Sequence, residues 1–143
     1  MTTTEDRGTA TAARSARLRG PVVLGVATLA ATAVVALRDP HVAGSYGVCP
    51  LYALTGLWCP GCGGLRATND LAHGDLAGAW SMNPLWVLAV PVVVGVWLAW
   101  IVRAARRQPS PSAPTWVPWA FLAVVVAFTV LRNIPALAPW LAP

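Results

Sequence analysis

The chain has 143 residues, of which 57% are apolar and only 10% are charged, and its formal net charge is +5. Soluble domains carry about 25% charged residues, so ten arginines, no lysine and five acids are too few to give this chain a polar shell. The composition excludes an ordinary soluble enzyme domain and indicates that lipid is the solvent. The arginines lie beside apolar runs rather than on one basic face, so no nucleic-acid partner is expected.

The first half of the chain predicts a tail, one membrane span and a polar segment. Residues 1–19 are small, polar and Arg-bearing, which predicts a disordered tail. Residues 20–37 are apolar and close to the roughly 20 residues that cross a bilayer, so they form the first predicted transmembrane helix. A signal peptide is the competing interpretation, because Ala31-Thr32-Ala33 resembles a cleavage site. Residues 38–83 are polar and hold all the cysteines.

The second half predicts two more spans. Residues 84–102 form the second, and Asn83-Pro84 supplies a favoured N-cap and first helical residue. A basic Pro/Ser-rich connector, 103–115, leads to the third and shorter span, 116–131, where Arg132 is expected to snorkel toward the interface. Residues 132–143 form a tail.

Arginine placement predicts the orientation. Seven arginines lie in the 1–19 tail and the 103–115 connector, and the other three lie on the opposite side. Positive loops face the cytoplasm, so we expect a cytoplasmic N-terminus and connector, and an extracytoplasmic Cys segment and C-terminal tail. The fold class is therefore predicted as all-α: an integral membrane protein with three transmembrane helices and a Cys-containing extracytoplasmic loop with a short interfacial helix.

Cys49, Cys59 and Cys62 give the spacing C-x9-C-x2-C and carry the distinctive chemistry of the chain. One interpretation is a metal knuckle, in which Cys-Pro-Gly-Cys turns two thiolates toward one ion and Cys49 is a third ligand. Zinc prefers four ligands in a tetrahedron, and His73 or His41 is the candidate for the fourth. Zinc is the cofactor that this interpretation implies.

A second interpretation is thiol–disulfide exchange through Cys59 and Cys62. A C-x-x-C pair at the start of a helix has a lowered thiol pKa, and Arg66, one turn later, favours a thiolate. No thioredoxin-like strand–helix–strand pattern surrounds the pair, however, and that context is what makes the motif diagnostic.

The favoured interpretation is a structural disulfide, because an outward loop lies in an oxidising compartment. Cys49 would pair with Cys59 or Cys62, and the third thiol would stay free, pair between chains or bind another group. Three reduced, buried thiols are the remaining alternative.

The residues after the cysteines predict a short amphipathic helix at the membrane interface. Gly63 precedes it, and Arg66 and Asp70 lie at i and i+4, the spacing of a surface ion pair. His73-Gly74 ends the helix, and Asp75 is expected to cap a second turn, Leu76–Trp80. Gly63, Arg66, Asp70 and Asn83 are therefore the predicted loop- and helix-positioning residues.

The order of motifs in this segment resembles a known family. The residues that carry the resemblance are Cys49-Pro50, Thr55-Gly56, Cys59-Pro60-Gly61-Cys62-Gly63, Arg66-Ala67, Leu71, Gly74-Asp75 and Asn83-Pro84. They are similar to the small bacterial membrane proteins grouped as domain of unknown function 2752, over about Cys49–Val102. The resemblance implies a polytopic bacterial membrane protein with the Cys segment beside a span, and it implies no activity or catalytic residue.

Two functional hypotheses follow. The favoured one is a non-enzymatic, multi-pass component of a bacterial plasma membrane. It contacts the lipid bilayer, binds other membrane-protein subunits or copies of itself, and uses the Cys loop as a rigid docking surface held by a disulfide or a metal. The alternative is a membrane thiol–disulfide or metal-handling protein that uses Cys59 and Cys62, with Cys49 as resolving thiol or third ligand. No catalytic residue is assigned.

Overall fold

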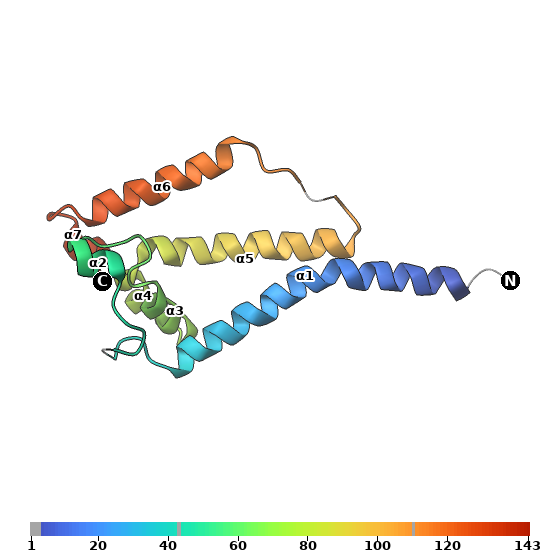
Figure 1. Ribbon diagram of the computed structural model, residues 1–143, viewed down its shortest axis with the longest axis horizontal. Helices are drawn as coiled ribbons and strands as arrows, with labels where there is room; N and C mark the ends of the chain where they lie inside the picture. Colours follow the sequence, from blue (N-terminus) through green and yellow to red (C-terminus); the bar gives the residue numbers. More distant parts are fainter. Residues whose placement is uncertain (1–3, 43, 110) are drawn as a thin grey trace. The chain divides into compact units, whose positions relative to one another are not determined.

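The computed structural model describes residues 4–42, 44–109 and 111–143, with side chains from Arg17 onward. These residues form helices and connecting turns, with no strand among them (Figure 1). The predicted all-α class is confirmed. In chain order the helices are α1 (Thr4–Leu37), α2 (Pro50–Thr55), α3 (Gly64–Ala72), α4 (Leu76–Met82), α5 (Pro84–Ala105), α6 (Trp116–Arg132) and α7 (Ala138–Leu141).

Two helices are long and apolar enough to cross a membrane. The Arg17–Leu37 part of α1 has 21 residues with a mean hydropathy of 2.1, and α5 has 22 residues with a mean hydropathy of 2.5. Only 6% and 0% of these apolar stretches are buried, whereas the core helix of a soluble protein would be mostly buried. Helix α6 is apolar but shorter, at 17 residues, so two of the three predicted spans reach spanning length and the third falls short of it.

The structure differs from the sequence prediction at the ends of the chain. Residues 4–19, predicted as disordered, begin α1, and residues 1–3 lie outside the described part. Alanine and arginine favour helix, and α1 continues from this segment through Pro21, which lies inside it, into the apolar run. Helices α2 and α7 were not predicted, because runs this short have no measurable hydrophobic period.

The described residues fall into two compact units. The first holds residues up to Ala30 together with Pro91–Ser112. Within it the indole Nε1 of Trp97 donates to the Pro21 carbonyl at 2.9 Å. A Cβ on Gly25 would lie 2.5 Å from the Trp97 ring, so the missing side chain at Gly25 is what lets the indole lie against α1.

The second unit, Ala31–Val90 with Ala113–Pro143, contains all three cysteines. Helix α4 contacts both α3 and α7 in it. Ala67 and Ala79 are fully buried here, and so are the much larger polar side chains of Asn83 and Arg132. A buried polar group is costly unless it is hydrogen-bonded. The hydrogen-bond partners of Asn83 and Arg132 therefore show which part of the chain these two side chains hold in place.

Candidate functional site

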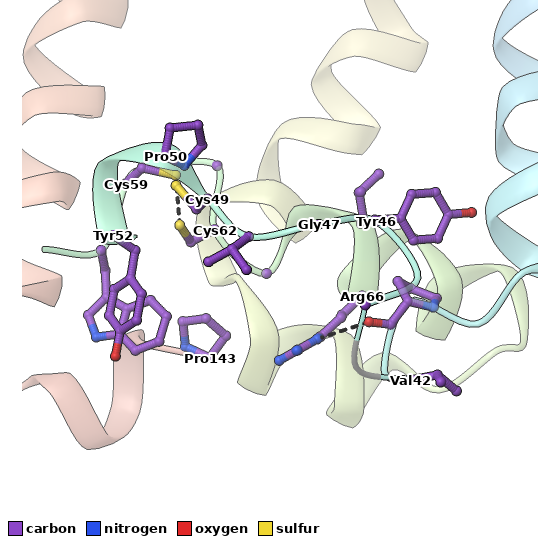
Figure 2. A pocket seen from close by; sticks show the side chains of 17 residues that line it. Val42, Tyr46, Gly47, Cys49, Pro50, Tyr52, Cys59, Cys62, Arg66 and Pro143 are labelled. Carbon is purple, nitrogen blue, oxygen red and sulfur yellow. Dashed lines mark hydrogen bonds between the residues drawn. The ribbon is translucent and has the colours of Figure 1, made fainter. Parts of the chain in front are cut away.

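The three cysteines converge on one point. The Sγ atoms of Cys49, Cys59 and Cys62 all lie within 4.8 Å of one another, and Figure 2 shows the three side chains pointing toward a common centre. Cys49 and Cys59 are half-buried and Cys62 is buried. The Sγ atoms of Cys59 and Cys62 are 2.8 Å apart, whereas a disulfide bond is about 2.03–2.05 Å long, so the cysteines are thiols in this structure. The cluster they form is called the thiol cluster below.

Local structure places each sulfur. Cys49 is the residue before α2, which starts at Pro50, where a missing N–H costs nothing. Pro60 and Gly61 turn the chain between the other two cysteines, and the turn is closed by the Cys62 N–H, which donates to the Cys59 carbonyl at 3.1 Å. Cys62 therefore lies directly before the glycines that begin α3.

Asn83 holds this turn from the start of α5. Its side chain is fully buried, and its Nδ2 donates to the carbonyls of Pro60 at 2.9 Å and Cys62 at 3.0 Å. Its Oδ1 accepts from the Trp86 N–H at 3.0 Å, which is the N-cap predicted from Asn83-Pro84. One amide thus fixes both the beginning of a candidate span and the position of two cysteines.

Arg132 holds the same turn from the end of α6. It is fully buried, and its Nη1 and Nη2 donate to the carbonyls of Cys59 at 2.7 Å and Cys62 at 3.2 Å. Its guanidinium carbon lies 4.9 Å from the centre of the Phe128 ring, and its Nε has no hydrogen-bond partner. The sequence predicted that this side chain would snorkel outward, but it points inward and donates to the two cysteine carbonyls.

The charge of Arg132 has no carboxylate partner. The ion pairs within 4.0 Å among the described residues join His41 to Asp39 and to Asp70, and none involves Arg132. A buried cation is costly unless it is paired. The thiol cluster is the neighbouring group that becomes negative when a proton leaves it, so Arg132 favours a thiolate or an anionic metal–thiolate complex at this place.

Asn133 fixes the chain just before Cys59. Its Oδ1 accepts from the Trp58 N–H at 2.8 Å and its Nδ2 donates to the Trp58 carbonyl at 2.9 Å, so the amide pairs with both backbone groups of one residue. The Trp58 ring stacks on Tyr52 of α2 with centroids 4.1 Å apart. The segment that carries Cys59 is therefore held against both α2 and the end of α6.

Gly63 is required by its backbone. Its φ of +82° is a left-handed conformation that favours glycine, and a Cβ would lie 2.3 Å from the Met82 carbonyl oxygen. Gly63 precedes α3 as its N-cap. Its missing side chain lets the cysteine turn lie directly against the end of α4, as expected for the loop-positioning role predicted from the sequence.

The cluster is electrically asymmetric. The backbone at Tyr52, followed by the neighbouring Cys62 and Cys59 thiols, lowers the pKa of Cys49 to about 7. Burial, followed by hydrogen bonding with the Cys59 and Cys49 thiols, raises the pKa of Cys62 to about 12. Near neutral pH the half-buried Cys49 therefore ionises more readily than the buried Cys62 in the metal-free cluster.

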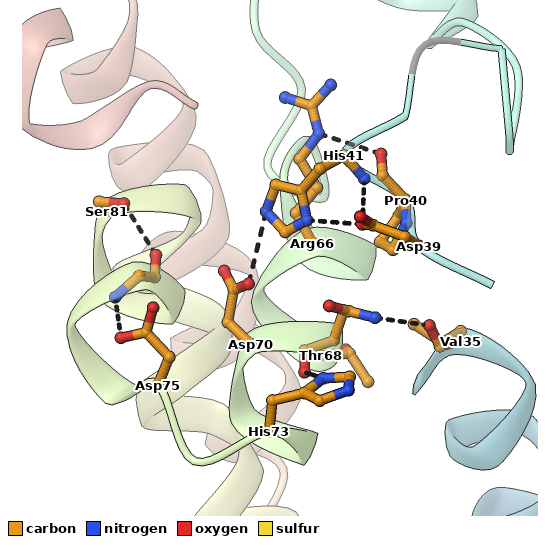
Figure 3. Close-up of polar contacts among 12 residues, drawn as sticks. Val35, Asp39, Pro40, His41, Arg66, Thr68, Asp70, His73, Asp75 and Ser81 are labelled. Atoms are coloured by element: carbon orange, nitrogen blue, oxygen red, sulfur yellow. Dashed lines mark hydrogen bonds and ion pairs between the residues drawn. The ribbon is translucent and has the colours of Figure 1, made fainter. Parts of the chain in front are cut away.

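The two histidines proposed as fourth ligands lie elsewhere. The Nδ1 of His73 is 2.8 Å from the Asn69 carbonyl one turn back, so His73 ends α3. His41 lies between Asp39 and Asp70, with its Nε2 3.4 Å from the Asp70 carboxylate (Figure 3). The group of potential metal ligands among the described residues is the three cysteines alone.

The predicted ion pair of Arg66 with Asp70 is not formed. Asp70 faces His41 instead, and the Nε of Arg66 donates to the Pro40 carbonyl at 3.3 Å (Figure 3). The chain around Pro40 returns to α3 and supplies both alternative partners, which helical spacing alone cannot reveal. Asp75, in contrast, caps α4 as predicted, accepting from the Gly78 N–H at 2.8 Å.

Sequence reasoning missed several residues that hold the site: Trp58, Asn69, Arg132 in its buried role, and Asn133. Asn69 is buried and donates to the Val35 carbonyl at 2.8 Å, which ties α3 to the end of α1. The available signal was an Arg-Asn pair directly after an apolar helix. That pair fits both inward hydrogen bonds and interfacial snorkelling, so it does not by itself place Arg132 inside the protein.

Comparison with known proteins supports the resemblance seen in the sequence. Residues 49–97 match the family model described as "Protein of unknown function (DUF2752)". The match begins at Cys49 and includes the thiol cluster, α3, α4 and the first part of α5. The chain matches none of the curated proteins and none of the solved structures with which it was compared.

Proposed function

We propose that this chain is a membrane-anchored metal-handling protein in which Cys49, Cys59 and Cys62 bind one soft metal ion. The observation that carries the proposal is the convergence of three sulfur atoms within 4.8 Å of one another. Thiolates select zinc and Cu⁺ over the harder cations. A redox pair needs only two converging sulfurs, whereas three that converge on one point match the ligand set of a metal ion.

The charge of the site supports a metal–thiolate complex. Three thiolates around Zn²⁺ carry one net negative charge, which the buried guanidinium of Arg132 offsets. Three protein ligands also leave one coordination position open, as in zinc sites that exchange ligands and unlike closed structural sites. This favours metal transfer or exchange over a purely structural knuckle.

We further propose that three helices cross a bacterial plasma membrane, with the N-terminus in the cytoplasm and the thiol cluster on the outer side. The support is the apolar character of α1, α5 and α6 and the concentration of arginine in the tail and the connector. Assembly with other membrane subunits or with further copies, and a docking role for the Cys segment, stay predictions.

A second candidate function is thiol–disulfide exchange, and the 2.8 Å separation of the Cys59 and Cys62 sulfurs favours it. In that reaction the two thiols lose two electrons and two protons and become a disulfide, and a partner disulfide takes up both and becomes two thiols. Cys49 would then be the third thiol, able to resolve a mixed disulfide.

Metal analysis of the full chain purified in detergent separates the two functions. We expect one Zn²⁺ or Cu⁺ per chain and a loss of affinity of more than about 100-fold in each Cys→Ser variant, since removing a ligand exceeds the 10–100-fold effect of removing a supporting contact. The control is His73→Gln, which should bind as the parent does. A metal-free protein with a Cys59–Cys62 disulfide would overturn the metal proposal and support the second candidate.

A further inference from the structure

A cavity of about 690 Å³ lies against the thiol cluster. Its size falls within the 300–1,000 Å³ of typical small-molecule sites. Figure 2 shows the sulfurs on one part of its wall and Arg66 on another. The stacked Tyr52 and Trp58 rings also contribute to the wall. The cavity wall therefore has an apolar part and two polar parts, one formed by the cysteine sulfurs and the other by Arg66.

Arg66 is the charged side chain among those that line this cavity. Its Nε donates to the Pro40 carbonyl. The Asp70 carboxylate, one turn later on α3, has its Oδ1 3.4 Å from the His41 Nε2 and its Oδ2 without a partner, and Asp70 is not among the residues that line the cavity. Pro143 also lines the cavity and forms no ion pair with Arg66 within the described part of the chain. The first turn of α3, which carries Arg66, has no acidic residue. This end of the cavity therefore suits an anion.

The other end suits sulfur. All three cysteines of the thiol cluster line the cavity, so a metal ion held by them would present its open position to a molecule inside it. A soft ion with three thiolate ligands prefers a further soft ligand. A molecule that carries a carboxylate and a thiol on an apolar stem satisfies both ends.

We propose that the cavity binds a small carboxylate-bearing thiol, which supplies the fourth sulfur ligand to the metal and pairs its carboxylate with Arg66. This inference rests on the proposed function. On binding, the sulfur–metal bond replaces a metal–water bond, the thiol proton goes to solvent, and no electron is transferred. The site would thus receive or release its metal by exchange with a small anionic thiol complex.

The test uses the full chain in detergent, loaded with Co²⁺, whose visible spectrum reports sulfur ligation. The cobalt protein is titrated with 3-mercaptopropionate and, separately, with the neutral 3-mercaptopropionamide. We expect the carboxylate thiol to bind about tenfold more tightly, since a charge-assisted hydrogen bond replaces a neutral one. Propionate, which has no sulfur, should leave the charge-transfer bands unchanged.

Variants then assign the preference. Arg66→Gln should bind Co²⁺ as the parent does but bind the two thiols equally, and Arg66→Lys should restore part of the preference. Arg103→Gln, which removes the same charge from the last turn of α5, is the matched control and should keep the full preference. Equal binding of the two thiols by the parent, or an undiminished preference in Arg66→Gln, overturns this inference alone. Failure of the parent to bind Co²⁺ overturns the proposed function and this inference with it.

Discussion

Replacing Asn83 with alanine removes three hydrogen bonds at once. Two of them hold the carbonyls of Pro60 and Cys62, and the third caps α5 through the Trp86 N–H. Loss of an N-cap costs about 1 kcal/mol, and each of the other two bonds contributes about 1 kcal/mol. Because the side chain is fully buried, water does not readily replace it, and we expect the free energy of unfolding to fall by about 3 kcal/mol.

Asn83→Ser separates the two roles of this side chain. Serine is also a good N-cap, but it cannot reach the two cysteine-turn carbonyls as the amide does, so about 2 kcal/mol of the loss should persist. Metal affinity should fall about 10–100-fold in both variants, the usual effect of removing a group that orients metal ligands.

The assay is a denaturant titration of the detergent-solubilised chain, followed by tryptophan fluorescence, combined with chelator competition for Zn²⁺. Ser81→Ala is the control, since this exposed hydroxyl makes one local bond, to the Gly78 carbonyl, and its removal should cost no more than about 0.5 kcal/mol. If Asn83→Ser binds Zn²⁺ as tightly as the parent, Asn83 is only a helix cap and the reasoning is refuted.

Two further predictions concern the same segment. Gly63→Ala should abolish metal binding and lower the free energy of unfolding by more than about 2 kcal/mol, because its Cβ would lie 2.3 Å from the Met82 carbonyl oxygen. The control is Gly74→Ala: Gly74 has the same left-handed backbone, but no atom lies within 4 Å of its Cβ position, so the loss should be only about 1–2 kcal/mol. Equal losses for the two variants in denaturant titration would contradict the claim that the Met82 carbonyl excludes a side chain at Gly63. In metal-free protein, the rate at which iodoacetamide alkylates Cys49 should rise as the pH passes about 7, where the Cys49 thiolate forms. The rate at Cys62, whose pKa is about 12, should stay low through pH 9. Peptide mass spectrometry measures both rates, and equal rates for Cys49 and Cys62 at pH 8 would contradict the difference between their pKa values.

Features set by neighbouring residues were predictable from the sequence. Asn83-Pro84 and Asp75 mark helix starts, because a cap acts on an N–H only two or three residues away. The apolar runs gave the long helices for a similar reason, since hydropathy sums over adjacent positions. The C-x2-C spacing located two of the three cluster sulfurs.

Features set by distant residues were not predictable in this way. Arg132 reaches carbonyls 70 and 73 residues earlier, and no local pattern distinguishes that burial from snorkelling. Asp70 pairs with His41 and not with Arg66. Helical spacing compares only residues of the same helix, and His41 lies outside α3. The assignment of His73 as a ligand was chemically reasonable, but its ring lies against the backbone of its own helix instead.

The long reach of Arg132 and Asn133 has a consequence for the order of biosynthesis. The cysteine turn is made early, whereas Arg132, which holds the Cys59 carbonyl, and Asn133, which holds the Trp58 carbonyl just before the turn, lie 73 and 75 residues later. During translation the turn therefore emerges without its guanidinium and its second amide, and both arrive only after α6 has been synthesised. During that interval Asn83 is the side chain that holds the turn, so the full set of contacts around the cysteines is completed late in the maturation of the chain.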